Sequence, residues 1–268
     1  MGFLYNYYIY SNMYIENNIT RKQISTWLII MLVLISLIII VGGLTRLTDS
    51  GLSITKWELF SGIFPPFNED QWIYYFDKYK LIPEFKIQNY AMTMDEFKVI
   101  FWWEWAHRIL GRIIGLVYII PLIYFTFKTG FKKLINLYFI FLLICFQGFV
   151  GWYMVSSGLI NRVDVSHFRL SLHLVLAFFI LSLILWNYLK LNVAFKNKVT
   201  LNILIPSSLL SLIYFQIIIG AFVSGMDAGL IYNSWPLMGN SYFPDDNKIV
   251  DLFKLTALSE ASLVQFLH

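Results

Sequence analysis

Hydrophobic residues occur along this chain in five long runs separated by polar connections. A bilayer core about 30 Å thick needs roughly 20 helical residues at 1.5 Å of rise each. Every run comes close to that length, so the pattern predicts five membrane-spanning helices. The runs cover residues 27–45, 108–127, 134–156, 170–189 and 200–224.

Basic residues in the polar connections predict the orientation of these helices. Three clusters alternate along the chain so that all of them fall on one side of the membrane, which by the positive-inside rule is the cytoplasm or its organellar equivalent. The N-terminal tail, residues 1–26, is then cytoplasmic, and the long segment 46–106 lies outside. The clusters are Arg21 and Lys22; Lys128, Lys132 and Lys133; and Lys190, Lys196 and Lys198.

The outer segment 46–106 contains its own helix signal. Thr93 and Glu96, in TMDE, have the spacing of a capping box, which predicts a helix that continues into the second span. Aromatic residues follow at once, and we interpret most of them as an interfacial belt. They are Phe97, Phe101, Trp102, Trp103 and Trp105.

Composition agrees with a bilayer setting. Hydrophobic residues make up 58% of the chain and charged residues 13%, against roughly 25% charged residues in a soluble domain. The net charge is only +4, which is too small and too scattered for a nucleic-acid partner. The single cysteine, Cys145, lies in an apolar run and excludes an intrachain disulfide or a CxxC site.

An internal repeat divides the chain. GGLTRLTDSGLSITKW, residues 42–57, aligns without gaps to GAFVSGMDAGLIYNSW, residues 220–235, and each copy follows an apolar span. The repeat predicts a first four-helix half, residues 27–198, and the start of a duplicated second half, residues 199–268. The fold class is therefore an all-α membrane protein with a four-helix transmembrane bundle, spans one to four, plus span five of a second bundle.

Two histidines fall at matching depths. The predicted topology makes spans two and four run in the same direction, with His107 at the start of one and His173 about one turn into the other. Parallel helices of a bundle that each offer one imidazole can supply opposite axial ligands to a heme iron. No third ligand with tetrahedral spacing accompanies the pair, so zinc is less attractive.

Small residues continue the faces that carry these histidines. Gly111 and Gly115 follow His107 at one and two turns, and Ala177 follows His173 at one turn. They could leave clearance for a porphyrin plane, or GRIIG could be a close helix-packing motif. The residues alone do not decide between the two interpretations.

Charged residues near the histidines are candidates for two roles. Glu104 lies one turn before His107 and could accept a proton, or it could be an anion held by Arg108. Four arginines lie near the outer helix ends, where they could bind heme propionates or extend to the interface as ordinary snorkelling residues. They are Arg46, Arg108, Arg112 and Arg169.

The two remaining histidines differ as candidate heme ligands. His268 follows the second copy of the repeat at the end of an apolar approach, SLVQFLH, as His107 follows the first copy at the end of WEWAH. His268 is thus the counterpart of His107. His167 lies in a polar loop, and we expect it at the surface.

Several long motifs together resemble the heme A synthase family, in the branch of mitochondria and α-proteobacteria (type 2). They occur in order over residues 42–268, so the resemblance is specific. The motifs are GGLTRLTDSGLS, PEF at 83–85, MDEFKVIFWWEWAHRILGR, GWYMVSSGL, RLSLHLVLAF, GAFVSGMDAG, NSWPLM and VQFLH.

The resemblance implies eight helices in two four-helix halves and a location in a bacterial cell membrane or the mitochondrial inner membrane. The first half would bind substrate heme O through His107 and His173, and His268 would be one axial ligand of a heme b cofactor in the second. The activity would be oxidation of the C8 methyl group of heme O to the formyl group of heme A, with Glu104 important to the chemistry. Heme O synthase and cytochrome oxidase assembly factors would be partners.

The chain departs from the family in length. Three helices and the second heme b ligand would follow residue 268, so we expect an incomplete heme b site. Two alternatives therefore stand beside the enzyme: a non-catalytic membrane b-type cytochrome, which would need the histidines but not Glu104, and an inactive truncated fragment.

Overall fold

The computed structural model describes residue 15 and residues 17–58, 61–160, 162–192, 202–234 and 236–268, and these contain helices and no strand. Each of the five longest helices is long and apolar enough to cross a membrane. The predicted spans and the all-α class are confirmed, and the chain is a multi-pass membrane protein. The five helices are α1 (Asn18–Leu47), α4 (Met94–Thr129), α5 (Ile135–Gly158), α6 (His167–Asn192) and α7 (Leu204–Gly225).

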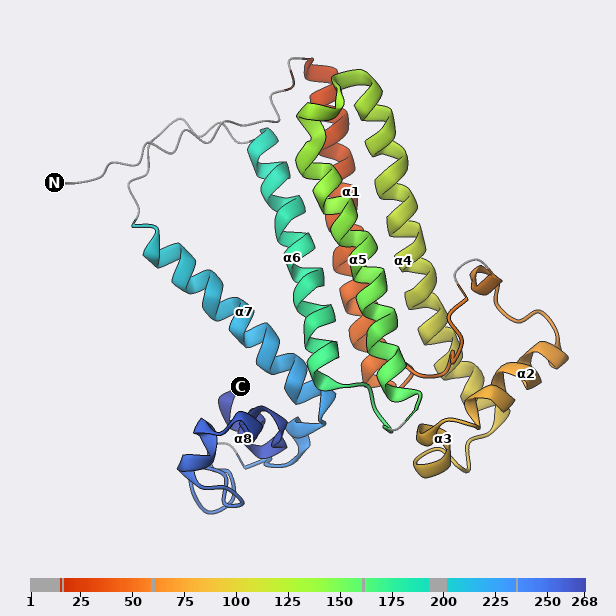
Figure 1. Ribbon diagram of the computed structural model, residues 1–268, viewed down its shortest axis with the longest axis vertical. Coiled ribbons are helices and arrows are strands. Elements are labelled where there is room, and N and C mark those ends of the chain that lie inside the picture. Colours follow the sequence, from red (N-terminus) through yellow and green to blue (C-terminus); the bar gives the residue numbers. More distant parts are fainter. Residues whose placement is uncertain (1–14, 16, 59–60, 161, 193–201, 235) are drawn as a thin grey trace.

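Four of these helices form an antiparallel bundle (Figure 1). Helix α1 packs against α4 and α6, and α5 packs against the same two helices. Helices α4 and α6 therefore occupy opposite corners and run in the same direction. Helix α7 packs against α6 near the C-terminal end of α7, and the N-terminal end of α7 lies away from the bundle (Figure 1).

The core of this bundle is mainly aliphatic and includes a few large aromatic side chains. Trp27 of α1 and Tyr118 of α4 pack ring to ring at 5.0 Å between centroids. Their polar atoms are satisfied by main-chain carbonyls: Trp27 Nε1 donates to Val117 at 2.9 Å, and the Tyr118 hydroxyl donates to Leu137 at 2.9 Å. Buried aromatic residues of this kind fill volume without leaving a donor unpaired.

Helix α4 begins with the predicted capping box. The Thr93 N–H donates to Glu96 Oε2 at 2.7 Å, and the Glu96 N–H donates to Thr93 Oγ1 at 3.4 Å. The helix then continues for 36 residues to Thr129, so one element joins the outer segment to the bundle. The short η2 (Phe131–Leu134) links it to α5 at the far end.

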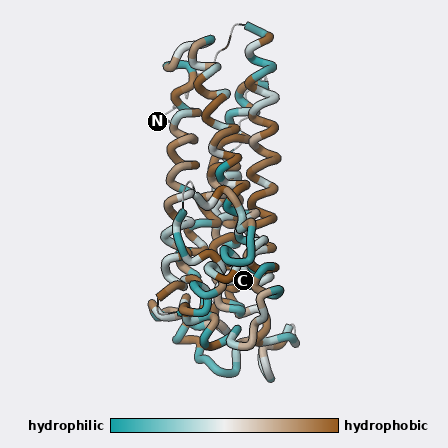
Figure 2. The backbone as a smooth tube through the Cα atoms, turned by 90° about the vertical axis from the view of Figure 1, so that its right-hand side faces the viewer, coloured by the Kyte–Doolittle hydropathy of each residue, from teal (hydrophilic) through white to brown (hydrophobic). Residues whose placement is uncertain are grey.

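Both long connections lie at one end of the bundle, which we call the loop-rich end (Figure 1). Figure 2 shows that hydrophilic residues gather at this end, while the helices beyond it are mainly hydrophobic. The first connection holds η1 (Ser61–Ile63), α2 (Glu69–Tyr79) and α3 (Pro83–Ile87). The second holds η3 (Ala228–Leu230), η4 (Ile249–Phe253), η5 (Leu255–Ser259) and α8 (Ala261–Leu267).

The interfacial-belt prediction is wrong for two aromatic residues. Phe97 and Phe101 are 0% and 2% exposed, because α2 folds back on α4 and covers them. Phe97 stacks on Phe76 at 4.9 Å between ring centroids. Trp102 on the same helix remains 43% exposed, as a belt residue should.

Several predictions fall outside the described residues. They concern the tail up to residue 14 and residue 16, the basic residues Lys196 and Lys198, the boundary between the halves at 198/199, and Trp235 of the repeat.

Candidate heme site

His107 and His173 project from the two diagonal helices α4 and α6. Each imidazole rests on a glycine of an intervening helix: a Cβ at Gly42 of α1 would lie 3.0 Å from His107 Cε1, and a Cβ at Gly151 of α5 would lie 3.0 Å from His173 Cε1. Both imidazoles therefore lie within the bundle, near its loop-rich end.

The surroundings of the pair fit a heme. His107 Nδ1 is buried and has no hydrogen-bond partner among the described residues. A Cβ at Gly115 would meet nothing within 4 Å, and one at Gly111 only the Ile38 methyl at 3.6 Å, so neither glycine serves close helix packing. The described residues hold no group of three or more His, Cys, Asp or Glu that could bind a metal ion.

Glu104 is buried one helical turn before His107 on α4. Its side chain is 3% exposed and accepts three hydrogen bonds: from Ser53 Oγ at 2.7 Å, from the Ile54 N–H at 2.8 Å and from Arg108 Nη2 at 2.6 Å. Arg108 Nη2 also donates to the Ile54 carbonyl at 2.9 Å. These contacts match the interpretation of Glu104 as an anion held by Arg108, and they fix the start of the outer segment against α4.

The other candidate propionate ligands also donate to protein oxygens. Arg112 Nη2 donates to the Glu58 carbonyl at 2.8 Å. Arg169 Nη1 donates to the Tyr153 carbonyl at 2.7 Å, and its guanidinium lies 3.8 Å from that ring centroid. Arg108 and Arg112 line the same small pocket at the loop-rich end, so these two are placed beside each other.

Arg46 makes the most extensive set of contacts and joins the two copies of the repeat. Its Nη1 lies 2.7 Å from Asp49 and 3.7 Å from Asp164, and its Nη2 lies 2.9 Å from Asp227. Nη2 also donates to the Ser224 carbonyl at 2.8 Å. In the repeat alignment, Ser224 is the counterpart of Arg46 itself, and Asp227 is the counterpart of Asp49.

Aligned positions of the repeat share local structure. Asp49 and Asp227 have φ of 47° and 49°, and they are the non-glycine residues with positive φ in the described chain. A Cβ at Gly220, the counterpart of Gly42, would lie 3.2 Å from His268 Nε2. His268 therefore rests on α7 as His107 rests on α1, which supports duplication.

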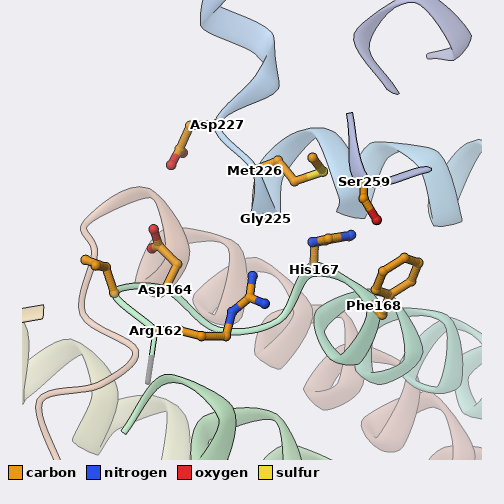
Figure 3. Close-up of a pocket in the computed structure, with 9 residues that line it drawn as sticks. Arg162, Asp164, His167, Phe168, Gly225, Met226, Asp227 and Ser259 are labelled. Atoms are coloured by element: carbon orange, nitrogen blue, oxygen red, sulfur yellow. The ribbon is translucent and has the colours of Figure 1, made fainter. Parts of the chain in front are cut away.

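The surface prediction for His167 is wrong. This residue begins α6, is 7% exposed and packs edge to face on Phe222 of α7 at 5.4 Å between ring centroids. The polar loop suggested exposure, but α7 covers it, with Gly225 directly against its Cβ. Figure 3 shows His167 beside a cavity of about 600 Å³ between the start of α6 and the second copy of the repeat. Its lining includes Arg162, Asp164, Met226, Asp227 and Ser259.

The sequence interpretation missed one residue in the heme site. Gln147 of α5 lies one turn before Gly151, and its Nε2 donates to the His173 carbonyl at 2.9 Å. An amide within an otherwise apolar run, four residues before a glycine, was the available signal.

Comparisons with known proteins agree with this site. The family model of the cytochrome oxidase assembly protein matches residues 25–268. The heme A synthase of Pelagibacter ubique (strain HTCC1062) is 53% identical over 260 residues, covering 96% of this chain and 77% of the relative. That of Rickettsia bellii (strain OSU 85-389) is 44% identical over 255 residues, covering 92% and 76%. No solved structure matches.

Proposed function

The chain belongs to the family of cytochrome oxidase assembly proteins, and from that premise we propose that it is a heme A synthase. As such it is an oxidoreductase that converts the C8 methyl group of heme O to the formyl group of heme A. The observation that carries the proposal is the diagonal pair His107 and His173, each seated on a glycine inside the bundle. Relatives called heme A synthases support it across most of the chain.

In this proposal His107 and His173 would hold the iron of the substrate heme. The iron supplies the redox chemistry when heme O is bound. The bundle would exclude water around the porphyrin, and Gly111 and Gly115 would leave room for it. Arg108 and Arg112 would bind the propionates, and Arg46 and Arg169 lie near the same end.

We assign Glu104 to the reaction through its neighbours. Its carboxylate orients Arg108 and holds Ser53 and Ile54 against α4. With three donors on its oxygens, it is better placed to keep Arg108 directed at the site than to exchange protons freely. Glu104 thus keeps the catalytic importance that the resemblance implies, through charge and position.

The remaining roles follow from the resemblance. His268 would be one axial ligand of heme b, and the loop-rich end would face away from the cytoplasm. Heme O synthase and cytochrome oxidase assembly factors would be partners that deliver substrate and accept product.

The test is heme analysis in cells that make heme O but lack their own heme A synthase. We expect the full chain to yield heme A, and we expect His107→Ala and His173→Ala to leave heme O unconverted. His167→Phe is the matched control, because it removes an imidazole outside the pair and should retain conversion. Absence of heme A with the wild-type chain would contradict the proposal.

Glu104 separates the enzyme from the alternative of a b-type cytochrome that only carries electrons. Glu104→Ala should abolish conversion while the purified protein still shows reduced-heme bands. Glu104→Gln, which can still accept the Ile54 hydrogen bond, should retain part of the activity. Unchanged conversion in Glu104→Ala would remove Glu104 from the reaction.

A further inference from the structure

A glutamine and a glycine one helical turn apart form a seat for His173. Gln147 Nε2 donates to the His173 carbonyl at 2.9 Å and lies 3.2 Å from Nδ1 and 3.3 Å from Nε2 of the imidazole. Its Oε1 is buried and has no partner among the described residues. Gly151, four residues later, contacts the same ring. The amide therefore lies against the imidazole through its nitrogen, while its oxygen has no partner among the described residues.

The same arrangement recurs at His268. Gln216 of α7 donates from Nε2 to the His268 main-chain oxygen at 3.1 Å, and Gly220, four residues later, lies under the imidazole. The sequences are QGFVG at 147–151 and QIIIG at 216–220. Residues four apart share one face of a helix. Each glutamine–glycine pair therefore presents a side-chain amide next to the space that the glycine leaves.

His107 contacts a glycine, but no glutamine stands one turn before that glycine. Gly42 contacts its ring, but the position four residues earlier is Ile38, which corresponds to Gln216 when the repeat alignment is extended four residues towards the N-terminus. Ile38 faces α4 at Gly111, one turn from His107. His107 Nδ1 has no partner among the described residues. The hydrogen bonds of the two imidazoles in the first site are thus unequal.

We propose that Gln147 is a positioning residue that makes His173 the firmly held ligand of the first heme site, and that His107, with Ile38 in the corresponding place, is the exchangeable ligand. The inference rests on the proposed function, because it presumes that this pair binds heme iron. A ligating histidine carries N–H on its other nitrogen, and an acceptor for that N–H fixes the ring and raises its basicity. In this structure the Gln147 amide nitrogen faces the ring nitrogens, so Oε1, which has no partner among the described residues, accepts this N–H once the side-chain amide has rotated. An exchangeable partner suits a site that must take in one heme and release another.

The test uses the purified full chain loaded with heme, read by heme retention and by carbon monoxide binding to the reduced heme, which requires an axial ligand to leave. Gln147→Leu should lower heme affinity by about tenfold or more, the size of effect usual for an outer partner of a metal ligand. Ile38→Gln should install the missing amide at His107 and weaken carbon monoxide binding by a similar factor. A purely structural role for these positions would not produce the second result.

Ile40→Gln is the matched control, because it makes the same change on α1 at a position that is 60% exposed. It should bind carbon monoxide like the wild type. Unchanged heme affinity in Gln147→Leu, or unchanged carbon monoxide binding in Ile38→Gln, would contradict the positioning role of the glutamine. Neither result would contradict the proposed function. A wild-type chain that shows no heme bands would overturn both.

Discussion

Glu84 is a buried carboxyl group whose hydrogen-bond partners are neutral. The Tyr79 hydroxyl donates to its Oε1 at 3.0 Å, and Asn89 Nδ2 donates to the same oxygen at 3.3 Å. The side chain is 4% exposed, and Oε2 is buried without a partner among the described residues. Burial raises the pKa of Glu84 to about 8, so the group is protonated in the folded protein at neutral pH.

We expect this group to make the loop-rich end less stable as pH rises. Nearby carboxylates of Glu104, Asp164 and Asp49 add to the upward pKa shift, and the Tyr79 hydrogen bond opposes it. Because the folded pKa exceeds the unfolded value, the stabilisation is full below pH 4.5 and is lost as pH rises towards 8. The loss should amount to a few kcal/mol at most, at roughly 1.4 kcal/mol per pKa unit.

The measurement is the thermal unfolding midpoint at several pH values between 4.5 and 9. Glu84→Gln should flatten the fall between acidic and alkaline pH, because a neutral amide does not titrate. Glu69→Gln, at an exposed position of α2, is the control and should keep the wild-type slope. An unchanged slope in Glu84→Gln would show that another group causes the fall.

Helix α5 places its contacts by spacing along one face. Gln147 and Gly151 are one turn apart and both meet His173. Gly148 lies between them in sequence, but a Cβ there would meet nothing within 4 Å. The helix thus offers two glycines of similar sequence context, and only one of them is under the imidazole.

We expect Gly151→Ala to disturb the heme site and Gly148→Ala to leave it intact. A Cβ at Gly151 would lie 3.0 Å from His173 Cε1 and 3.8 Å from Nε2, so the ring must shift. Heme retention should fall several-fold, although alanine favours the helix by about 1 kcal/mol. Heme absorbance per protein after purification measures the effect. Equal heme retention in the two variants would argue against contact between α5 and the His173 imidazole.

At the scale of the whole molecule, Arg46 connects the two copies of the repeat. Its guanidinium pairs with Asp49 of its own copy and Asp227 of the other. Its own side chain is 15% exposed, but the Asp49 and Asp227 side chains are 69% and 62% exposed, so water screens these ion pairs. The end of α1 and the end of α7 are tied together beside the cavity lined by His167.

Arg46→Gln should loosen the second copy from the bundle. We expect a loss of about 1 kcal/mol, since several hydrogen bonds would be removed but their exposed acceptors would be hydrated. Limited proteolysis within residues 226–234 should become faster. Lys80→Gln, which removes the exposed pair with Asp77, is the control and should change little. Equal cleavage rates in both variants would mean that other contacts hold the copies together.

Features that depend on local order along the chain could be predicted before the structure was known. Apolar run length predicted the five spans, and the TMDE spacing predicted the cap of α4 at Thr93. Parallel direction followed from counting spans, so His107 and His173 could be paired by depth. The burial of His167 and Phe97 could not be predicted, because it depends on α7 and α2, which approach from distant parts of the sequence.

The sequence by itself determined which elements form and which residues share a helix, because hydrophobic run length and helical period are local properties. It also determined the duplication signal, whose aligned aspartates adopt the same backbone conformation. Only the tertiary structure decided what those faces meet: Glu104 with Ser53, Arg46 with Asp227, and Gln147 with His173. The physical reason is that periodicity gives a residue's direction from its own helix axis, whereas its partner depends on how separate helices are rotated and packed.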